Sequence, residues 1–185
     1  MIKLVVSDID GTLVPDGSNQ IDPDIYTVIR ELKDRGIRFV AASGRQYESI
    51  RRLMAPVADD ILFVAENGGK VMFRDKFVSV DYMGTELAKE LILFLRDLPE
   101  CEIMLATPDY TWLETKDEAF ADWMINGYKF KLRRTENLLP LCSDTIKIAA
   151  YRRKGIQDIL KKIRGRFEGR MNITVSGEMW VDCMS

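Results

Sequence analysis

The sequence contains no histidine and only three cysteines among its 185 residues. The lack of histidine excludes catalytic triads with a histidine base and the usual histidine-containing zinc sites. Cys101, Cys142 and Cys183 are odd in number and widely spaced. This pattern is typical of reduced thiols in a cytoplasmic protein rather than of a disulfide framework. Carboxylates therefore remain the natural groups for catalysis.

The sequence also lacks a strong charge of one sign and a long hydrophobic run. Its net charge of −2 gives no electrostatic argument for binding nucleic acid or an acidic membrane surface. It has no signal-peptide pattern and no apolar run of membrane-spanning length. A hydrophobic content of 46% and a charged content of 30% are ordinary for a globular protein. We expect one large or two small cytoplasmic domains that bind neither nucleic acid nor membrane, with the oligomeric state left open.

The chain is organised around its first apolar run. Leu4, Val5 and Val6 have the pattern of a strand that is buried on both faces of a parallel sheet. Asp8 and Asp10 follow at once, and residues i and i+2 at a strand end point to the same side. Ligands bind at this end of strands in open α/β sheets. Two close carboxylates favour a divalent cation, and their hard oxygen atoms favour Mg²⁺.

The residues around this acid pair also suit a phosphoryl group. A carboxylate can act as a nucleophile that becomes phosphorylated. Gly11 allows a sharp turn, and its amide can face a phosphate oxygen. An ordinary turn after a strand is the alternative, because Asp and Gly are favoured turn residues. The position after a valine-rich strand and before Thr12-Leu13 favours the site.

Strands and helices then alternate. The apolar periodicity predicts helices over residues 22–36 and 47–54 and strands over residues 37–42 and 61–65. Short connections between these segments indicate a right-handed, doubly wound arrangement. The ends of the three strands, which carry polar or glycine-rich residues, should therefore lie side by side.

Two of these strand ends carry further candidate residues. Ser43-Gly44-Arg45 supplies a hydroxyl donor, a backbone amide that a ligand can approach closely, and a cation. These groups suit a phosphoryl group held opposite Asp8, although serine is also favoured as a helix cap. Asn67-Gly68 follows the third strand and fits a plain hairpin turn as well as a place beside the site.

These motifs carry a resemblance to a known family. The segment from Asp8 to Leu13 resembles the first motif of the haloacid dehalogenase superfamily, Asp-x-Asp-Gly-Thr-Leu/Val. The resemblance implies that Asp8 is the nucleophile that forms an aspartyl-phosphate and that Asp10 is the general acid/base. It also implies that the Asp8 carboxylate and the Asp10 backbone carbonyl bind Mg²⁺.

The later strand ends resemble the Cof-like branch of this superfamily. Ser43-Gly44-Arg45 is similar to the second motif of that branch, which implies that Ser43, Gly44 and Arg45, together with Gly11, bind the transferring phosphoryl group. Asn67-Gly68 is also similar to that branch, and it implies a place for Asn67 on the substrate side of the site.

The second half of the sequence reads as an α+β unit with antiparallel strands and helices on one face, similar to the IIB-type cap of the Cof-like branch. We therefore expect an α/β fold: a partial doubly wound parallel core of the haloacid dehalogenase type over residues 1–83, with an inserted α+β cap over residues 84–185. The cap aromatics are expected to be mostly core residues: Tyr110, Trp112, Phe120, Trp123 and Trp180.

The resemblance covers only part of a family member. The third-motif Lys and the fourth-motif acidic residues of the superfamily would follow the cap, and they do not occur before Ser185. We therefore expect a fragment that lacks about two or three βα units, turns over weakly or not at all, and exposes its first strand at a sheet edge.

The function that the resemblance implies is Mg²⁺-dependent hydrolysis of small phosphorylated metabolites. A phosphomutase acting on sugar phosphates is an alternative within the enzymes. A non-catalytic fragment that binds a ligand or a protein through its cap is an alternative of another class. The sequence does not identify the substrate, because cap side chains set it.

Overall fold

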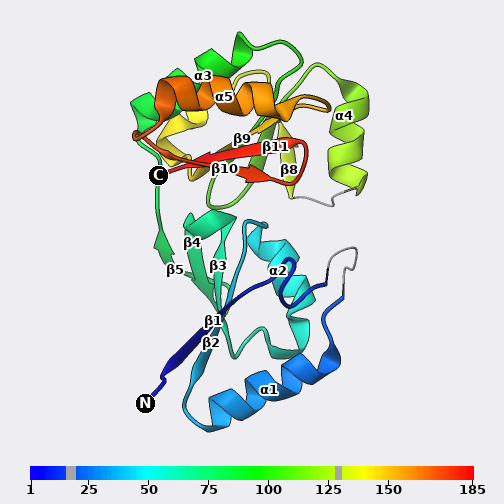
Figure 1. The fold of residues 1–185 in the computed structure, drawn as a ribbon, viewed down its shortest axis with the longest axis vertical. Coiled ribbons are helices and arrows are strands. Elements are labelled where there is room, and N and C mark those ends of the chain that lie inside the picture. Colours follow the sequence, from blue (N-terminus) through cyan, green and yellow to red (C-terminus); the bar gives the residue numbers. More distant parts are fainter. Residues whose placement is uncertain (16–19, 128–130) are drawn as a thin grey trace. The chain divides into compact units, whose positions relative to one another are not determined.

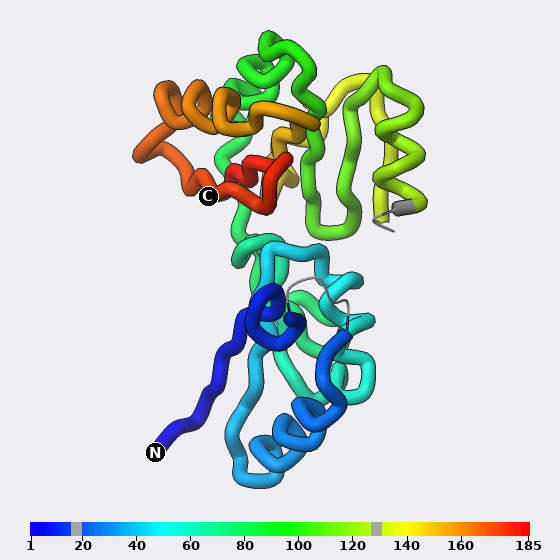
Figure 2. Tube along the Cα trace, turned by 45° about the vertical axis from the view of Figure 1, so that its right-hand side comes forward, coloured from blue at the N-terminus to red at the C-terminus, as the bar shows by residue number. Residues whose placement is uncertain are grey.

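The computed structural model describes residues 1–15, 20–127 and 131–185. The chain divides into two compact units, Met1–Val80 (unit 1) and Asp81–Ser185 (unit 2). Each unit is built on its own β-sheet, as the ribbon shows (Figure 1). Figure 2 follows the course of the chain through each unit.

Unit 1 has a five-stranded sheet with the strand order β1-β2-β3-β4-β5. Its main elements are β1 (Leu4–Asp8), α1 (Pro23–Asp34), β2 (Arg38–Ala42), α2 (Tyr47–Leu53), β3 (Leu62–Ala65), β4 (Lys70–Phe73) and β5 (Lys76–Val80). The first three strands pair in parallel, and β4 and β5 extend the sheet with antiparallel pairing. The predicted alternation of strands and helices is confirmed.

The helices of unit 1 cover one face of this sheet. The Asp22 carboxylate caps α1 by accepting a hydrogen bond of 3.0 Å from the Asp24 amide. Ile29 of α1 and Ile50 of α2 belong to the same buried cluster as Phe63 of β3. Both crossovers advance across the sheet in the same direction, and right-handed crossovers in one direction place their helices on the same face.

The predicted burial of the first strand on both faces is therefore wrong. Val5 packs against the helical cluster, but Leu4 and Val6 point to the other face and are 52% and 57% exposed. The strand β1 is also an edge of the sheet, as we expected from the sequence. An apolar run alone did not distinguish a strand covered on two faces from one covered on a single face.

Unit 2 has a six-stranded sheet with the strand order β10-β11-β9-β6-β7-β8. Its main elements are α3 (Thr85–Arg96), β6 (Glu102–Ala106), β7 (Thr111–Glu114), α4 (Glu118–Asp122), β8 (Leu132–Arg134), β9 (Lys147–Tyr151), α5 (Ile156–Phe167), β10 (Asn172–Ser176) and β11 (Trp180–Met184). All neighbouring strands pair antiparallel except β7 and β8, which are parallel.

The helices of unit 2 lie on both faces of its sheet. Leu91 of α3 and Ile159 of α5 share a buried cluster with Leu105 of β6, and Figure 1 shows the two helices on the same side. Phe120 of α4 instead packs with Met104, whose side chain points opposite to that of Leu105. The expectation that the helices occupy one face is therefore wrong for α4, because alternate β6 residues on both faces are apolar and buried.

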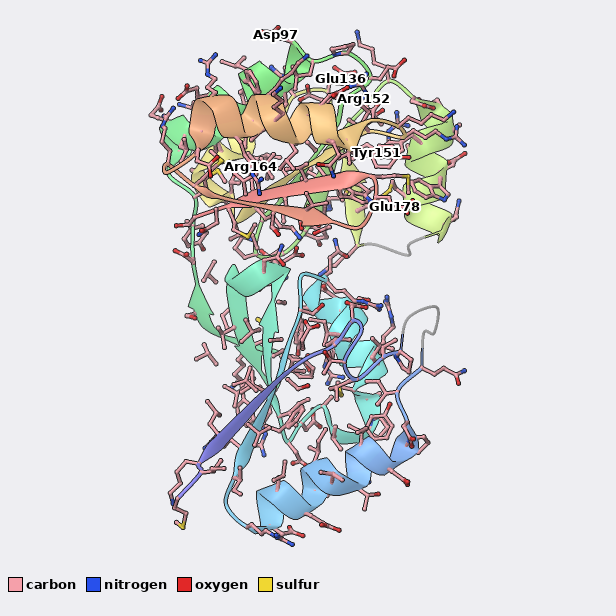
Figure 3. All side chains as sticks on the ribbon, in the orientation of Figure 1. Asp97, Glu136, Tyr151, Arg152, Arg164 and Glu178 are labelled. Carbon is pink, nitrogen blue, oxygen red and sulfur yellow. The ribbon has the colours of Figure 1, made fainter. Side chains whose placement is uncertain are left out.

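The face of the sheet that α4 covers carries an aromatic group. Tyr151, labelled in Figure 3, lies with its ring centroid 4.5 Å from that of Phe120 and 4.8 Å from that of Trp180. Trp123 is 5.8 Å from Tyr151 and is 39% exposed, whereas Phe120 and Tyr151 are buried. The prediction that these aromatics are core residues is confirmed for Phe120.

The cysteines are free thiols, as the sequence suggested. Burial raises the pKa of the Cys101 thiol and of the Cys183 thiol to about 12 each. Their thiolate forms, which are the reactive ones, are therefore disfavoured near neutral pH. Over the described parts of the chain, no helix combines the length and the apolar character that a membrane crossing requires.

A hydrogen-bonded cluster fastens the β4–β5 hairpin to α2. The Tyr47 hydroxyl donates to Asp75 Oδ1 over 2.7 Å, and Arg51 donates to both Asp75 oxygens over 2.6 and 2.9 Å. Asp75 lies in the hairpin turn with a left-handed φ of 61°. Burial and then the Asp75 carboxylate raise the pKa of Tyr47 from 10.0 to about 12.

This pKa predicts how the stability of unit 1 depends on alkaline pH. Because the folded state disfavours tyrosinate, Tyr47 stabilises the fold fully below pH 10.0 and loses this contribution as the pH rises toward 12. Tyr47→Phe removes the hydrogen bond and should lower the free energy of unfolding by about 1 kcal/mol near neutral pH. Urea unfolding should show the difference between the two proteins shrinking above pH 10.0. Lysines also titrate in this pH range, but they do so in both proteins and cancel in the comparison. A difference in unfolding free energy that stays constant above pH 10.0 would therefore contradict the raised pKa of Tyr47.

Candidate active site

Parallel pairing brings three loops together at the carboxyl-terminal ends of β1, β2 and β3. Asp8, the last residue of β1, lies opposite Ala42 of β2, and Ala42 lies opposite Val64 of β3. The segments that follow these strands therefore leave the sheet beside one another. Together with Asp8 at the end of β1, these segments contain the residues that the sequence predicted for the site.

The end of β1 and the loop after it hold the two candidate carboxylates. The carbonyl of Asp8 accepts a hydrogen bond of 3.0 Å from the Ser7 hydroxyl, and within the described residues the Asp8 carboxylate forms no hydrogen bond or ion pair. Gly11 has a left-handed φ of 74°, which fits the sharp turn expected there. Its amide donates to the Val14 carbonyl over 2.9 Å, so this donor is used within the loop.

The loop after β2 binds the second carboxylate. Arg45 Nε lies 3.0 Å from both Asp10 oxygens, and a terminal nitrogen of Arg45 lies 2.5 Å from Oδ1. The buried Ser43 hydroxyl donates to Asp10 Oδ2 over 3.3 Å and accepts from the Arg45 amide over 3.1 Å. The structure therefore brings the side chains of Asp10, Ser43 and Arg45 together.

The loop after β3 is bonded to the loop after β2. The Glu66 amide donates to the Arg45 carbonyl over 3.1 Å, and the Asn67 amide donates to the Ser43 carbonyl over 3.2 Å. A Cβ atom placed on Gly44 would lie 2.5 Å from Asn67 Oδ1, so the Asn67 side chain lies directly over Gly44. Asn67 thus lies beside the predicted phosphoryl-binding residues, although it also belongs to the turn between two antiparallel strands.

Three polar side chains near these loops were missed from the sequence. Gln46, Glu66 and Lys70 are buried, with exposed fractions of 7%, 3% and 4%. Charged side chains are seldom buried without a partner, and both Glu66 and Lys70 have one. The two residues are therefore held in fixed positions next to the candidate site. Glu66 and Lys70 lie on either side of Asn67-Gly68 in the sequence, and this position could have indicated them.

The carboxylate oxygens of the site suit Mg²⁺, but the described residues do not supply enough ligands to surround the ion. Mg²⁺ usually keeps several waters and binds one or two carboxylates together with substrate phosphates. Among the described residues, the Asp8 carboxylate has no hydrogen-bond or ion-pair partner and could act as such a ligand. Across the residues that the structure describes, histidine, cysteine, aspartate and glutamate form no group of three or more that could hold a metal ion.

Curated proteins similar to this chain are phosphatases. One is a 5-amino-6-(5-phospho-D-ribitylamino)uracil phosphatase of Escherichia coli, 29% identical over 136 residues, which are 74% of this chain and 50% of that protein. Another is phosphoglycolate phosphatase 1 of Saccharolobus solfataricus, 40% identical over 100 residues, which are 52% of this chain and 44% of that protein. The chain thus spans half or less of the length of these two relatives.

Solved structures match the whole chain. A crystal structure from Eubacterium rectale matches with a TM-score of 0.88 and 32% identity, and covers 100% of this chain with 71% of its own. A structure from Thermotoga maritima, at 21% identity and a TM-score of 0.80, shows the same fold over 69% of its own length. The family model that describes haloacid dehalogenase-like hydrolases matches residues 5–185 of this sequence. Together with the loops at the end of the parallel strands, this match shows that the chain belongs to the haloacid dehalogenase-like hydrolase family.

Proposed function

We propose that this chain takes part in the Mg²⁺-dependent hydrolysis of small phosphorylated metabolites, with Asp8 as the nucleophile. The observation that carries the proposal is the contrast between the two carboxylates of the β1 loop. Asp10 is held by Ser43 and Arg45, whereas the Asp8 carboxylate has no hydrogen bond or ion pair within the described residues and is exposed. A nucleophile must be unshielded, and a general acid must be positioned by its neighbours.

The proposed reaction has two steps. In the first, an Asp8 oxygen attacks phosphorus, the bond from phosphorus to the leaving oxygen breaks, and Asp10 gives its proton to that oxygen. In the second, Asp10 takes a proton from water while the water oxygen attacks phosphorus, which releases phosphate and restores the Asp8 carboxylate. The first step needs a carboxylate on one side of the phosphoryl group and a protonated carboxyl on the other, and the second step needs the deprotonated Asp10 as a base.

The remaining site residues bind charge rather than exchange protons. The Ser43 hydroxyl and the Arg45 guanidinium are donors that suit phosphoryl oxygens, and they already lie within hydrogen-bonding distance of Asp10. The Asp8 carboxylate and the Asp10 carbonyl would hold Mg²⁺. When bound, the ion supplies positive charge that offsets the repulsion between the carboxylate and the phosphoryl oxygens.

The substrate class follows from the named relatives only at a coarse level. The E. coli relative is named for a phosphorylated ribitylaminouracil and the S. solfataricus relative for phosphoglycolate, two compounds that share little beyond a phosphate ester. Neither is a mutase by name, which favours phosphate release over phosphate migration. The proposed class is therefore phosphorylated small molecules in general.

The test of the nucleophile uses an acyl-phosphate analogue, because it does not require turnover. Beryllium fluoride binds carboxylates in the manner of a phosphoryl group, and ¹⁹F NMR detects the bound form. With Mg²⁺ present, the unsubstituted chain should give a bound resonance, and Asp8→Asn should abolish it because an amide oxygen is a poor ligand and nucleophile. Asp8→Asn should equally abolish any release of phosphate from p-nitrophenyl phosphate that the unsubstituted chain shows.

Two controls keep this test sharp. Asp109→Asn changes an exposed carboxylate of unit 2 and should leave the bound resonance intact. Removal of Mg²⁺ with a chelator should remove the resonance, and addition of Mg²⁺ should restore it. A bound resonance that survives Asp8→Asn would eliminate Asp8 as the nucleophile.

A separate prediction concerns the Ser43 hydroxyl. Ser43→Ala should weaken the affinity for beryllium fluoride by about tenfold to a hundredfold, because a hydrogen bond to a charged group contributes about 1.5–3 kcal/mol. Ser79→Ala, at an exposed position of β5, is the matched control and should have no effect. Equal affinities of the two variants in an NMR titration would remove Ser43 from the phosphoryl site.

A further inference from the structure

The segment after β3 has an unusual backbone. Glu66, Asn67 and Gly68 follow one another with left-handed φ angles of 54°, 55° and 100°. Residues with a Cβ atom avoid this region, although asparagine tolerates it better than most. A run of such residues persists only where the surrounding structure holds it in place, and such runs are concentrated at functional sites.

The loop after β2 supplies the contacts that hold this segment. The backbone amides of Glu66 and Asn67 donate to the carbonyls of Arg45 and Ser43 over 3.1 and 3.2 Å. The Ser43 amide in turn donates to the Val64 carbonyl over 2.9 Å. The loop after β2 is thus bonded through its backbone both to the end of β3 and to the segment that follows β3, so a shift of one loop moves the other.

The side chain of Asn67 adds a steric constraint at the centre of this contact. From the position that a Gly44 Cβ would occupy, Asn67 Oδ1, Cγ and Nδ2 lie 2.5, 3.2 and 3.4 Å away. A real Cβ atom does not approach an oxygen to 2.5 Å, so any residue larger than glycine at position 44 would require the Asn67 carboxamide to move. Gly44 is flanked by Ser43 and Arg45, and both of these donate hydrogen bonds to Asp10.

We propose that Asn67 is a positioning residue that acts through Gly44. Its carboxamide packs on the Gly44 backbone and fixes the direction in which the Ser43 hydroxyl and the Arg45 guanidinium leave the loop. By the function proposed above, on which this inference rests, those two groups bind the phosphoryl oxygens. Asn67 therefore sets the affinity of the site for a phosphoryl group through the loop, without a contact of its own to the reacting atoms.

A double-mutant cycle on Gly44 and Asn67 tests this inference. Asn67→Gly removes the carboxamide and keeps the left-handed backbone, which glycine adopts readily. Gly44→Ala places a methyl group against the carboxamide oxygen. The affinities of the parent chain, the two single variants and the double variant for beryllium fluoride are measured by ¹⁹F NMR with Mg²⁺, and their unfolding midpoints are measured in urea.

The expected result is strong coupling between the two positions. Each single variant should bind beryllium fluoride about tenfold more weakly than the parent chain. Gly44→Ala should cost much less in the Asn67→Gly background, because the methyl group then meets no side-chain oxygen. Gly165→Ala is the matched control, since a Cβ there has no neighbour within 4 Å, and it should leave the affinity unchanged.

Several outcomes would overturn the inference. It fails if Asn67→Gly keeps the parent affinity and only lowers the unfolding midpoint, since Asn67 would then be purely structural. It fails also if Gly44→Ala costs the same affinity in both backgrounds, because the carboxamide would not be the cause. If the parent chain binds no beryllium fluoride, the proposed function fails together with the inference, which distinguishes that case from the other two.

Discussion

The parallel pairing of β1, β2 and β3 is the constraint on which the site depends. It sets Asp8 opposite Ala42 and Ala42 opposite Val64, so that three loops distant in sequence leave the sheet at one edge. Side chains alternate along a strand, so a slip of one residue in this register would turn Asp8 to the opposite face. The hydrogen bonds between Asp10 and Arg45, which are 35 positions apart, exist only because of this register.

Periodicity in the sequence predicted the elements well but not the faces they cover. The helix predicted over residues 22–36 is found at Pro23–Asp34, because a capping aspartate, a proline and a final glycine mark its ends. Leu4 and Val6 were expected to be buried, yet an apolar run carries no information on which side the crossovers place their helices. The strand Leu132–Arg134 was missed because three residues are too few to show a period.

The residues of the proposed site could be picked out from the sequence, but the contacts between them could not. Strand ends rich in polar residues pointed to Asp10, Ser43 and Arg45, and the structure joins these by hydrogen bonds. No comparable pattern in the sequence predicted that Glu66 is buried or that the Asn67 carboxamide lies over Gly44. Both features result from left-handed backbone angles and tertiary hydrogen bonds, which depend on positions that the chain reaches only after folding.

The pairing of Asp10 with Arg45 bears on how the proposed reaction can proceed. Asp10 must give up its hydrogen bonds from Ser43 and Arg45 before it can protonate a leaving oxygen. Arg45 must likewise leave Asp10 before it can bind a phosphoryl group. The two side chains are 51% and 29% exposed, and an exposed ion pair contributes only about 0–1 kcal/mol. A phosphoryl dianion is a stronger partner for a guanidinium than one carboxylate is, because it offers more charge and more acceptor oxygens. We therefore expect Arg45 to exchange Asp10 for a phosphoryl group readily, so that the ion pair orders both side chains before the substrate binds without blocking the proposed reaction.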